Sequence, residues 1–230
     1  MVSPQAKPSA LLEAVLPAGV ATAQLTGAGD PALLLAGERQ VLGHAAPGRA
    51  REFAAGRLCA RHAAAQLGIV GCAIGARDDR RPQWPVRLTG SITHTEGFTA
   101  AAVGDRRRFQ AIGIDAERIG RVSRELWRHV LVPAEAGWLE SLPAAAQATG
   151  AALMFSAKEA FYKCQYEVTQ QWLEFQDIAV EFCGRSPDRS SFAVRPVGRV
   201  RLFEQGGAPA IVHFALTREM VLTAMTIAAH

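Results

Sequence analysis

Two long stretches of the chain place apolar residues at a helical spacing. Residues 47–68 are rich in alanine, open with a proline that suits a first helical turn and close with a glycine that can end a helix. Residues 123–165 also show a mostly helical pattern, which Pro133 and Pro143 interrupt because proline breaks the hydrogen bonding of a helix interior. A shorter helix is expected near residues 31–42. The pattern therefore predicts one long helix in each half of the chain.

Alternating and β-branched segments flank these helices and predict strands. Strands are expected at residues 19–24, in a hairpin at residues 91–104, and at residues 111–119, 175–183, 190–205 and 211–229. Residues 69–90 are expected to be irregular, because Pro82 and Pro85 prevent regular structure there. Each half of the chain then contains a helix followed by hairpin strands.

This repeated order of elements predicts an α+β fold made of two similar halves. Each half is expected to be a mostly antiparallel sheet packed with a long helix. The boundary is placed near Gln110, which makes residues 1–110 the N-terminal half and residues 111–230 the C-terminal half. A duplicated α+β unit explains the order, although the identity between the two halves is low.

Composition and charge narrow the class of protein. The chain of 230 residues is 49% apolar and 20% charged, so it can bury a core and is expected to be globular. Its net charge of +4 and pI of about 9.2 suit an anionic ligand or an acidic partner without requiring one. The four cysteines show no metal-binding spacing, and no signal-peptide pattern or long apolar run is present. A soluble cytoplasmic protein with free thiols is expected.

The segment GIDAERIG, residues 113–120, carries the first candidate chemistry. Asp115 and Glu117 are two residues apart on a predicted strand, so both carboxylates point to one side, which Gly113 keeps open. Hard oxygen ligands of this kind suit Mg²⁺, which takes its remaining ligands from water and substrate phosphates. The alternative is a solvated face of an edge strand.

The segment MFSAKEAFYK, residues 154–163, places three charges among aromatic residues. Glu159 and Lys163 are four residues apart and share a helix face, and Lys158 lies about 100° round from Glu159. An ordinary surface pair above an aromatic core stripe explains Glu159 and Lys163 but leaves Lys158 unexplained. The functional interpretation is a third metal carboxylate flanked by two cations that bind phosphate oxygens.

The N-terminal half contains further candidates for phosphate binding. Thr93 and His94 follow a proline-rich approach, and a hydroxyl with an imidazole can hold a phosphate. Arg49, Arg57 and Arg61 lie on the first long helix, where arginine's fork suits phosphate oxygens. A structural histidine in a turn and a solvated arginine stripe are the alternatives.

Four motifs occur in one order along the chain: AAGRLCARHAA; RPQWP followed by GSITHTEGFTAAAV; IGIDAERI; and FSAKEAFYK followed by WLEFQDIAV. Together they resemble the Sfp-type 4′-phosphopantetheinyl transferases, in the branch of the enterobactin and mycobacterial enzymes. The resemblance covers residues 47–181, and the pairing of GIDxE with FSAKEAxYK is its most specific part. The chain has Thr93 where the family often has serine, and Arg81 where it often has lysine, so the hydroxyl and the positive charge are kept.

The resemblance implies an enzyme that transfers the 4′-phosphopantetheine arm of coenzyme A to a serine of an apo acyl or peptidyl carrier protein. Mg²⁺ dependence and release of 3′,5′-ADP are implied with it. So is the family's fold, two halves related by a pseudo-twofold axis, with the N-terminal half on the coenzyme A phosphate side and the C-terminal half on the metal and catalytic side. The implied metal ligands are Asp115, Glu117 and Glu159, and the implied catalytic residues are Glu159 and Lys163, with Glu159 as the base, a metal ligand or both. The implied coenzyme A-binding residues are Arg49, Arg57, Arg81, Pro82, Thr93, His94, Lys158 and Lys163.

A carrier protein is the expected partner, and carriers of fatty-acid, polyketide and nonribosomal-peptide systems all fit. Such carriers are usually acidic helical bundles. Residues 118–130 bring Arg121, Arg124 and Arg128 near one another, with Leu126 and Trp127 between them, and form the hypothetical docking segment. An ordinary solvated basic helix explains the segment equally well. We expect a monomer with no nucleic-acid or membrane partner.

Other functions fit parts of the pattern. A Mg²⁺-dependent phosphohydrolase or nuclease acting on a nucleotide pyrophosphate would use the same acidic residues with a water nucleophile, but it leaves the ordered set of motifs unexplained. A nucleic-acid binder would depend on the three arginines at residues 106–108, yet no nucleic-acid-binding module accompanies them. An inactive relative is disfavoured because the three carboxylates and Lys163 are all present.

Overall fold

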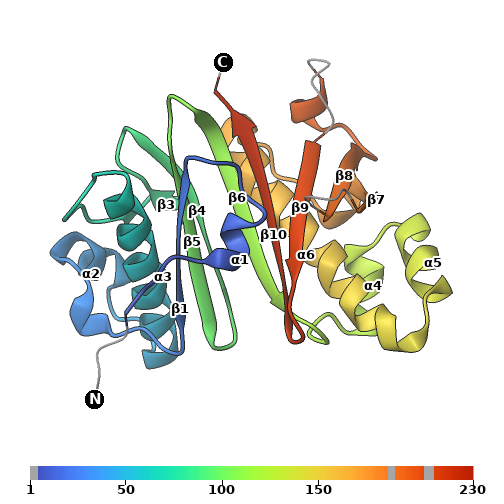
Figure 1. Cartoon of the computed structure of the whole chain (residues 1–230), viewed down its shortest axis with the longest axis horizontal. Coiled ribbons are helices and arrows are strands. Elements are labelled where there is room, and N and C mark those ends of the chain that lie inside the picture. The colour runs from blue at the N-terminus through green and yellow to red at the C-terminus, as the bar shows by residue number, and fades with distance from the viewer. Residues whose placement is uncertain (1–4, 186–189, 205–209, 230) are drawn as a thin grey trace. The chain divides into compact units, whose positions relative to one another are not determined.

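The computed structural model describes residues 5–185, 190–204 and 210–229 and divides the chain into two compact units (Figure 1). Unit 1 comprises Met1–Glu13, Pro17–Ile112 and Ile227–His230, and unit 2 comprises Ala14–Leu16 and Gly113–Thr226. The main division thus falls inside a strand that begins at Phe109, just beyond the boundary expected at Gln110. Ala14–Leu16 belongs to unit 2, although the residues on both sides of it belong to unit 1. Ile227–His230 belongs to unit 1, although the preceding residues belong to unit 2.

Unit 1 is a three-stranded antiparallel sheet with a long helix packed on it. Its elements are α1 (Ala10–Glu13), β1 (Val20–Thr26), η1 (Pro31–Leu33), α2 (Ala36–Leu42), α3 (Pro47–Gln66), β2 (Gly75–Ala76), β3 (Pro82–Gln83), β4 (Leu88–Thr95) and β5 (Phe98–Asp105). The strand order is β1-β5-β4, and β2 pairs with β3 in a separate two-stranded ribbon. Helix α3 contacts all three strands of the main sheet.

Small residues let α3 lie close to its neighbours. Its buried face consists largely of alanine, which joins the strand residues in one core cluster. At Gly29, a side chain would collide with the backbone of α3, because an added Cβ would lie 2.6 Å from the carbonyl oxygen of Arg51. The alanine content that predicts a helix therefore also sets how tightly this helix packs.

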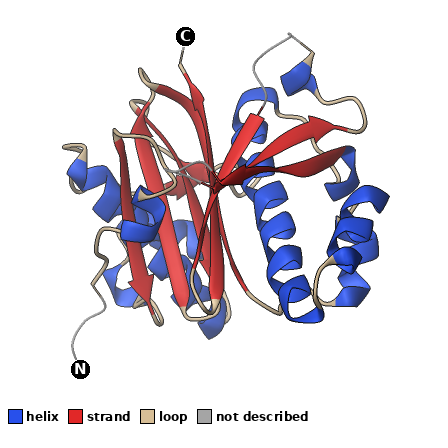
Figure 2. Ribbon diagram, turned by 45° about the vertical axis from the view of Figure 1, so that its right-hand side comes forward, coloured by secondary structure: helices blue, strands red, loops and turns tan. Residues whose placement is uncertain are grey.

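Unit 2 is a larger sheet with a long helix packed against it and two shorter helices beside that helix or the segment that follows it. Its elements are most of β6 (Phe109–Arg118), then α4 (Arg124–Val130), α5 (Pro133–Ser141), α6 (Ala144–Thr169), η2 (Phe175–Asp177), β7 (Ile178–Arg185), β8 (Ser190–Pro196), η3 (Arg201–Phe203), β9 (Ala210–Leu216) and β10 (Met220–Ala228). The strand order is β6-β10-β9-β8-β7, with antiparallel pairing from β7 through β10. Figure 2 shows the long helix α6 beside the strands of this unit.

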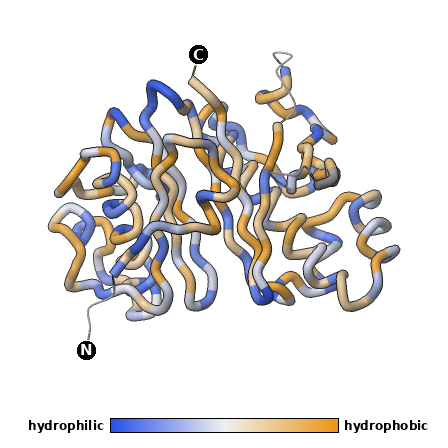
Figure 3. Tube along the Cα trace, viewed as in Figure 1, coloured by the Kyte–Doolittle hydropathy of each residue, from blue (hydrophilic) through white to orange (hydrophobic). Residues whose placement is uncertain are grey.

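The α+β class with antiparallel sheets and a long helix in each unit is confirmed. Pro133 and Pro143 start α5 and α6 by standing at the first turn or just before it, where proline is tolerated. The turns between β5 and β6 and between β9 and β10 are hydrophilic, as Figure 3 shows, in keeping with their arginine and glutamate residues. No helix within the described ranges is long and apolar enough to cross a membrane.

Four details of the predicted elements were wrong. Residues 190–205 were expected to be strand throughout, but β8 ends at Pro196 and Arg201–Phe203 is a 3₁₀ turn; position 205 lies outside the described residues. Residues 31–42 form a 3₁₀ turn and a separate short helix, and residues 211–229 form two strands joined by a turn. Two short strands, β2 and β3, and the start of β4 fall in the segment expected to be irregular.

Candidate functional site

In unit 2, Gly113 on β6 lets helix α6 pack directly on the strand backbone. A Cβ at this position would lie 2.7 Å from the backbone nitrogen of Cys164 and closer still to the carbonyl oxygen of Ala160. Gly113 was expected to leave one side of its strand open, but α6 fills that side. This close approach brings Lys163 on α6 over Asp115 on β6.

Substituting Gly113 by alanine is expected to destabilise unit 2 and to separate these charged groups. The methyl group can be accommodated only if α6 shifts, and overpacking of this kind costs about 1–3 kcal/mol. Thermal unfolding of Gly113→Ala should therefore show a lower Tm than the wild type. The control is Gly137→Ala, because no atom lies within 4 Å of an added Cβ there. An unchanged Tm for Gly113→Ala would contradict the backbone contact.

The ammonium group of Lys163 lies among acidic groups. Its Nζ is 2.7 Å from Oδ1 of Asp115 and 3.9 Å from Oε2 of Glu159, and it donates to the carbonyl oxygen of Ile114 at 3.3 Å. Burial disfavours the charged lysine, but the charges of Asp115 and Glu159 outweigh burial and raise the pKa of Lys163. The lysine therefore remains a cation in this cluster.

Glu159 is the carboxyl group that these surroundings perturb most clearly. Burial raises its pKa, and the charges of Asp115 and Glu117 raise it further, against the opposing effect of Lys163. Glu117 accepts a hydrogen bond from the backbone N–H of Arg118 at 2.7 Å. The structure thus brings together four of the five residues predicted on this strand and helix, which we call the acidic cluster: Asp115, Glu117, Glu159 and Lys163.

The donor atoms of the acidic cluster suit Mg²⁺, but they do not form a closed cage. Among the residues that the structure describes, no three histidine, cysteine, aspartate or glutamate side chains are arranged to hold a metal ion. Mg²⁺ is commonly held by one or two carboxylates, with water and substrate phosphates completing its shell. The charges of Asp115 and Glu117 raise the pKa of Glu159, so the site is chemically suited to a cation, and here Lys163 supplies the neighbouring positive charge.

Lys158 was expected at the coenzyme A phosphates, and the structure places its ammonium group elsewhere. The side chain is buried, with an ion pair to Oε2 of Glu135 at 2.8 Å. Its Nζ also donates to the carbonyl oxygens of Val130, Phe175 and Ile178 at 2.8 to 2.9 Å. An ammonium group has three protons to donate, so these oxygens satisfy it fully. Its assignment to phosphate binding was wrong.

An apolar pocket of about 230 Å³ opens beside Glu159. Its walls come from α6 and from the segment that follows it: Lys158, Glu159, Phe161, Tyr162, Trp172, Leu173, Glu174, Phe175 and Ile178. Tyr162 meets the exposed Trp172 edge to face, with ring centroids 5.7 Å apart. Glu159 and the stem of Lys158 are the charged side chains on the α6 wall. The pocket suits a slender, largely apolar ligand whose reactive end reaches Glu159.

In unit 1, Arg57 is a buried cation with spare hydrogen-bonding capacity. Its Nη2 donates to the carbonyl oxygen of Gly75 at 2.9 Å, and its guanidinium lies 4.2 Å from the ring centre of Phe53. Its Nε is buried and has no hydrogen-bond partner among the described residues. Burial is the main cause that lowers the pKa of Arg57 to about 10, so the group stays charged near neutral pH. A buried cation with one unpaired donor atom is suited to an anionic ligand.

The other predicted residues of unit 1 lie in more ordinary surroundings. Arg49 and His94 are exposed and both approach Glu52, at 3.5 and 3.4 Å. Arg81 pairs with Asp79 at 2.7 Å, directly before Pro82 on β3. Thr93 is buried on β4. Arg61, a sequence candidate for a phosphate clamp, instead pairs with Glu38 and donates to the carbonyl oxygen of Leu33 at 2.8 Å.

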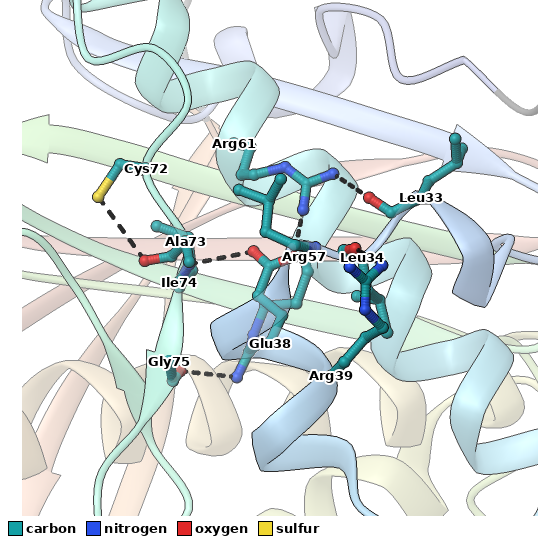
Figure 4. A network of polar contacts seen from close by, with 11 residues as sticks. Leu33, Leu34, Glu38, Arg39, Arg57, Arg61, Cys72, Ala73, Ile74 and Gly75 are labelled. Carbon is teal, nitrogen blue, oxygen red and sulfur yellow. Dashed lines mark hydrogen bonds and ion pairs between the residues drawn. The ribbon is translucent and has the colours of Figure 1, made fainter.

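Two buried glutamates, Glu38 and Glu135, were not among the residues predicted from the sequence. Each accepts a hydrogen bond from a backbone N–H at the start of its own short helix and pairs with a cation on the long helix of its unit. Figure 4 shows the contacts of Glu38. The available signal was a glutamate in the first turn of a short helix that lacks a polar N-cap residue, since such a carboxylate can cap the helix itself.

The hypothetical docking segment is only partly exposed. Arg124 pairs with Glu140 at 2.8 Å and lies over the ring of Trp127, 5.2 Å from its centre. Trp127 is buried, whereas Leu126 is exposed. Trp127 therefore belongs to the core of unit 2, and a partner on this side would meet Leu126 and the arginines.

Comparison with known proteins gives consistent matches. Residues 37–104 match the family described as 4′-phosphopantetheinyl transferase N-terminal domain, and residues 111–209 match the 4′-phosphopantetheinyl transferase superfamily. The chain is 36% identical over 172 residues to 4′-phosphopantetheinyl transferase Npt of Nocardia iowensis, covering 75% of this chain and 77% of the relative. It is 33% identical over 229 residues to 4′-phosphopantetheinyl transferase PptT of Mycobacterium tuberculosis, covering 94% and 98%.

A partial likeness to a solved structure accompanies these matches. A holo-(acyl-carrier-protein) synthase from Bacillus anthracis aligns with a TM-score of 0.40 and 20% identity, covering 54% of this chain and 99% of that one. The sequence matches span both units and include the acidic cluster as well as the α3 arginines. The chain belongs to the 4′-phosphopantetheinyl transferase superfamily.

Proposed function

We propose that this protein transfers the 4′-phosphopantetheine arm of coenzyme A to a serine of an apo acyl or peptidyl carrier protein, with Mg²⁺, and releases 3′,5′-ADP. The observation that carries the proposal is the acidic cluster at the edge of an apolar pocket. Phosphoryl transfer needs positioning and charge neutralisation more than covalent chemistry, and this site offers both.

In the proposed reaction the serine oxygen attacks the phosphorus that carries pantetheine. The bond from that phosphorus to the bridging oxygen breaks, and 3′,5′-ADP departs with the bridging oxygen. Glu159 takes the proton of the serine hydroxyl, directly or through a water. Burial keeps the pKa of Glu159 above its usual range, which makes it a stronger base than an ordinary glutamate. Lys163 neutralises negative charge on the pyrophosphate as the bond breaks.

Asp115, Glu117 and Glu159 would hold Mg²⁺ on the pyrophosphate. The ion supplies charge neutralisation and orients the phosphate oxygens. Each carboxylate is hard and anionic, and Asp115 lies 2.7 Å from the Lys163 ammonium, a position already suited to a cation. The open arrangement leaves room for phosphate oxygens as ligands. Chelation with EDTA is the corresponding test of metal dependence.

The pocket beside Glu159 would take the pantetheine arm. Its largely apolar aromatic walls suit a chain of methyl, methylene and amide groups, and its volume of about 230 Å³ suits a narrow ligand. In unit 1, Arg57 would bind the 3′-phosphate with its unsatisfied Nε, together with Arg49 and His94. Arg81, Pro82 and Thr93 would lie along the nucleotide.

The deciding experiment measures the intact mass of an apo carrier protein after incubation with this protein, coenzyme A and Mg²⁺. A gain of one phosphopantetheine per carrier, lost with EDTA, is the expected result. Matched reactions without carrier should release no nucleotide. No mass gain on acyl and peptidyl carriers alike would overturn the proposal, and nucleotide release without a carrier would identify a phosphohydrolase instead.

Substituting Arg57 by methionine is expected to weaken coenzyme A binding. A charge-assisted hydrogen bond contributes about 1.5–3 kcal/mol, which corresponds to a rise in KM for coenzyme A of roughly 10- to 100-fold. The kcat should change little, because Arg57 contacts the nucleotide end in this proposal. Steady-state kinetics with varied coenzyme A measure both constants.

The matched control is Arg51→Met, which removes an exposed arginine from the same helix. Its KM for coenzyme A should stay near the wild-type value. Equal KM values for the two variants would remove Arg57 from the proposed phosphate site.

A further inference from the structure

We propose that Glu38 and Glu135 are positioning residues that hold the ligand-facing segment of their own unit in place. Each ties that segment to the long helix of the unit through a buried cation. The inference rests on the proposed function, because the segments concerned are those assigned to coenzyme A. It assigns no ligand contact to either glutamate.

The Glu38 network comprises Leu35, Glu38, Arg61 and Ile74, and Figure 4 labels the last three of these residues. Glu38 accepts hydrogen bonds from the backbone N–H groups of Leu35 at 2.9 Å and Ile74 at 3.0 Å, and it pairs with Arg61 on α3. Ile74 is followed by Gly75, whose carbonyl oxygen receives the hydrogen bond from Arg57. Glu38 therefore fixes the segment that orients Arg57.

The Glu135 network comprises Val132, Glu135, Lys158 and Val180. Glu135 accepts hydrogen bonds from the backbone N–H groups of Val132 at 2.8 Å and Val180 at 2.7 Å, and it pairs with Lys158 on α6. The carboxylate thus connects the start of α5, the long helix and the strand β7.

Lys158 connects the Glu135 network to the pocket beside Glu159. Its ammonium group binds the carbonyl oxygens of Phe175 and Ile178, which are wall residues of the pocket beside Glu159. Lys158 also directly precedes Glu159 on α6. The contacts of the Lys158 ammonium group with four oxygen atoms therefore fix the position of the wall residues Phe175 and Ile178 relative to Glu159, the proposed base.

The two networks contain the same three kinds of contact. In each unit a buried glutamate caps its own short helix, binds a backbone N–H of a distant segment, and pairs with a cation from the long helix. A buried ion pair is weak evidence for stability, because apolar residues of similar size can replace it at little cost. Its presence at corresponding places in both units points to a geometric role.

The test uses two double variants that remove both charges of a pair, so that no unpaired buried charge remains. They are Glu38→Gln with Arg61→Met, and Glu135→Gln with Lys158→Met. For each we would measure kcat and KM for coenzyme A in the carrier assay, and the inhibition constant of 3′,5′-ADP, which lacks the pantetheine arm. The control is Arg195→Met with Glu181→Gln, an exposed ion pair in unit 2.

The two variants should fail in different ways. The Glu38 variant should bind 3′,5′-ADP roughly tenfold more weakly, since Arg57 is no longer held, with little change in kcat. The Glu135 variant should lower kcat and raise KM for coenzyme A by roughly tenfold or more, with inhibition by 3′,5′-ADP unchanged, because small misplacements at a reacting centre are costly. Simple loss of folded protein would lower kcat alone and would leave KM and the inhibition constant unchanged.

Wild-type kinetics in both double variants, or one identical defect in both, would overturn the inference. If a double variant does not fold, Glu38→Asp or Glu135→Asp takes its place, because aspartate keeps the negative charge on a shorter side chain. The aspartate variants should then show the same kinetic defects as described for the corresponding double variants. Absence of transfer by the wild-type protein would overturn the proposed function, and this inference with it.

Discussion

Substituting Glu159 by glutamine is expected to lower kcat by roughly 10²- to 10⁴-fold, the usual contribution of a general base. The amide keeps the size of the side chain but cannot accept the serine proton. It also removes one negative charge from the acidic cluster, where Glu159 lies 3.9 Å from Lys163. The KM for coenzyme A should change much less. Single-turnover transfer to the carrier, followed by intact mass, measures the effect on chemistry alone.

Glu167→Gln, further along the same helix, is the matched control and should keep kcat near the wild-type value. The pH profile gives a second check. Burial raises the pKa of Glu159, so its proton is retained to a higher pH than in an ordinary glutamate. The wild-type rate should therefore fall as the pH drops through that raised pKa, and the glutamine variant should lack this dependence. A kcat within tenfold of the wild type would remove Glu159 as the base.

Substituting Lys158 by alanine is expected to lower the free energy of unfolding by about 3–5 kcal/mol, as is typical when one partner of a buried ion pair is removed. The change leaves Glu135 charged and buried, and it removes the donor to three carbonyl oxygens. Urea unfolding followed by circular dichroism measures the loss. The free energy of unfolding of a typical domain is only about 5–15 kcal/mol, so a loss of this size is a large fraction of the total.

Lys163→Ala is the informative comparison, since the Lys163 side chain is 28% exposed whereas the Lys158 side chain is fully buried. This variant should lose activity with a smaller loss of stability than Lys158→Ala. The opposite result, a stable Lys158→Ala protein that binds 3′,5′-ADP more weakly, would restore Lys158 to the phosphate site.

Local sequence patterns predicted the elements that depend on neighbouring residues. The long helix in each half follows from alanine content, apolar spacing and proline positions, and the strands with Asp115 and His94 follow from alternation. The strand predicted over Arg201–Phe203 was wrong: the apolar alternation continues there, but the strand β8 ends at Pro196 and these residues form a 3₁₀ turn. Alternation of apolar and polar residues does not distinguish a strand from such a short turn.

Each pair within the acidic cluster was predictable from its spacing on one regular element, whereas the meeting of the two pairs, with Asp115 and Lys163 48 residues apart, was expected from the family resemblance. Asp115 and Glu117 share a strand, and Glu159 and Lys163 share a helix face. The roles of Lys158 and Arg61 were not predictable in this way. Each is one helical position or turn from a candidate ligand, and only its tertiary neighbours show that it meets a buried glutamate instead.

The sequence by itself determined the α+β class, the two long helices, the charged pairs Asp115–Glu117 and Glu159–Lys163, and the resemblance to the phosphopantetheinyl transferases. These depend on spacing along the chain, where a period of 3.6 or 2 residues sets which side chains share a face. Only the tertiary structure decided that α6 packs on the backbone at Gly113, that a pocket lies beside Glu159, and that Glu38 and Glu135 bind the cations of the long helices. Those contacts join residues distant in sequence, and the energy of a buried charge depends on the partners that the folded chain brings to it.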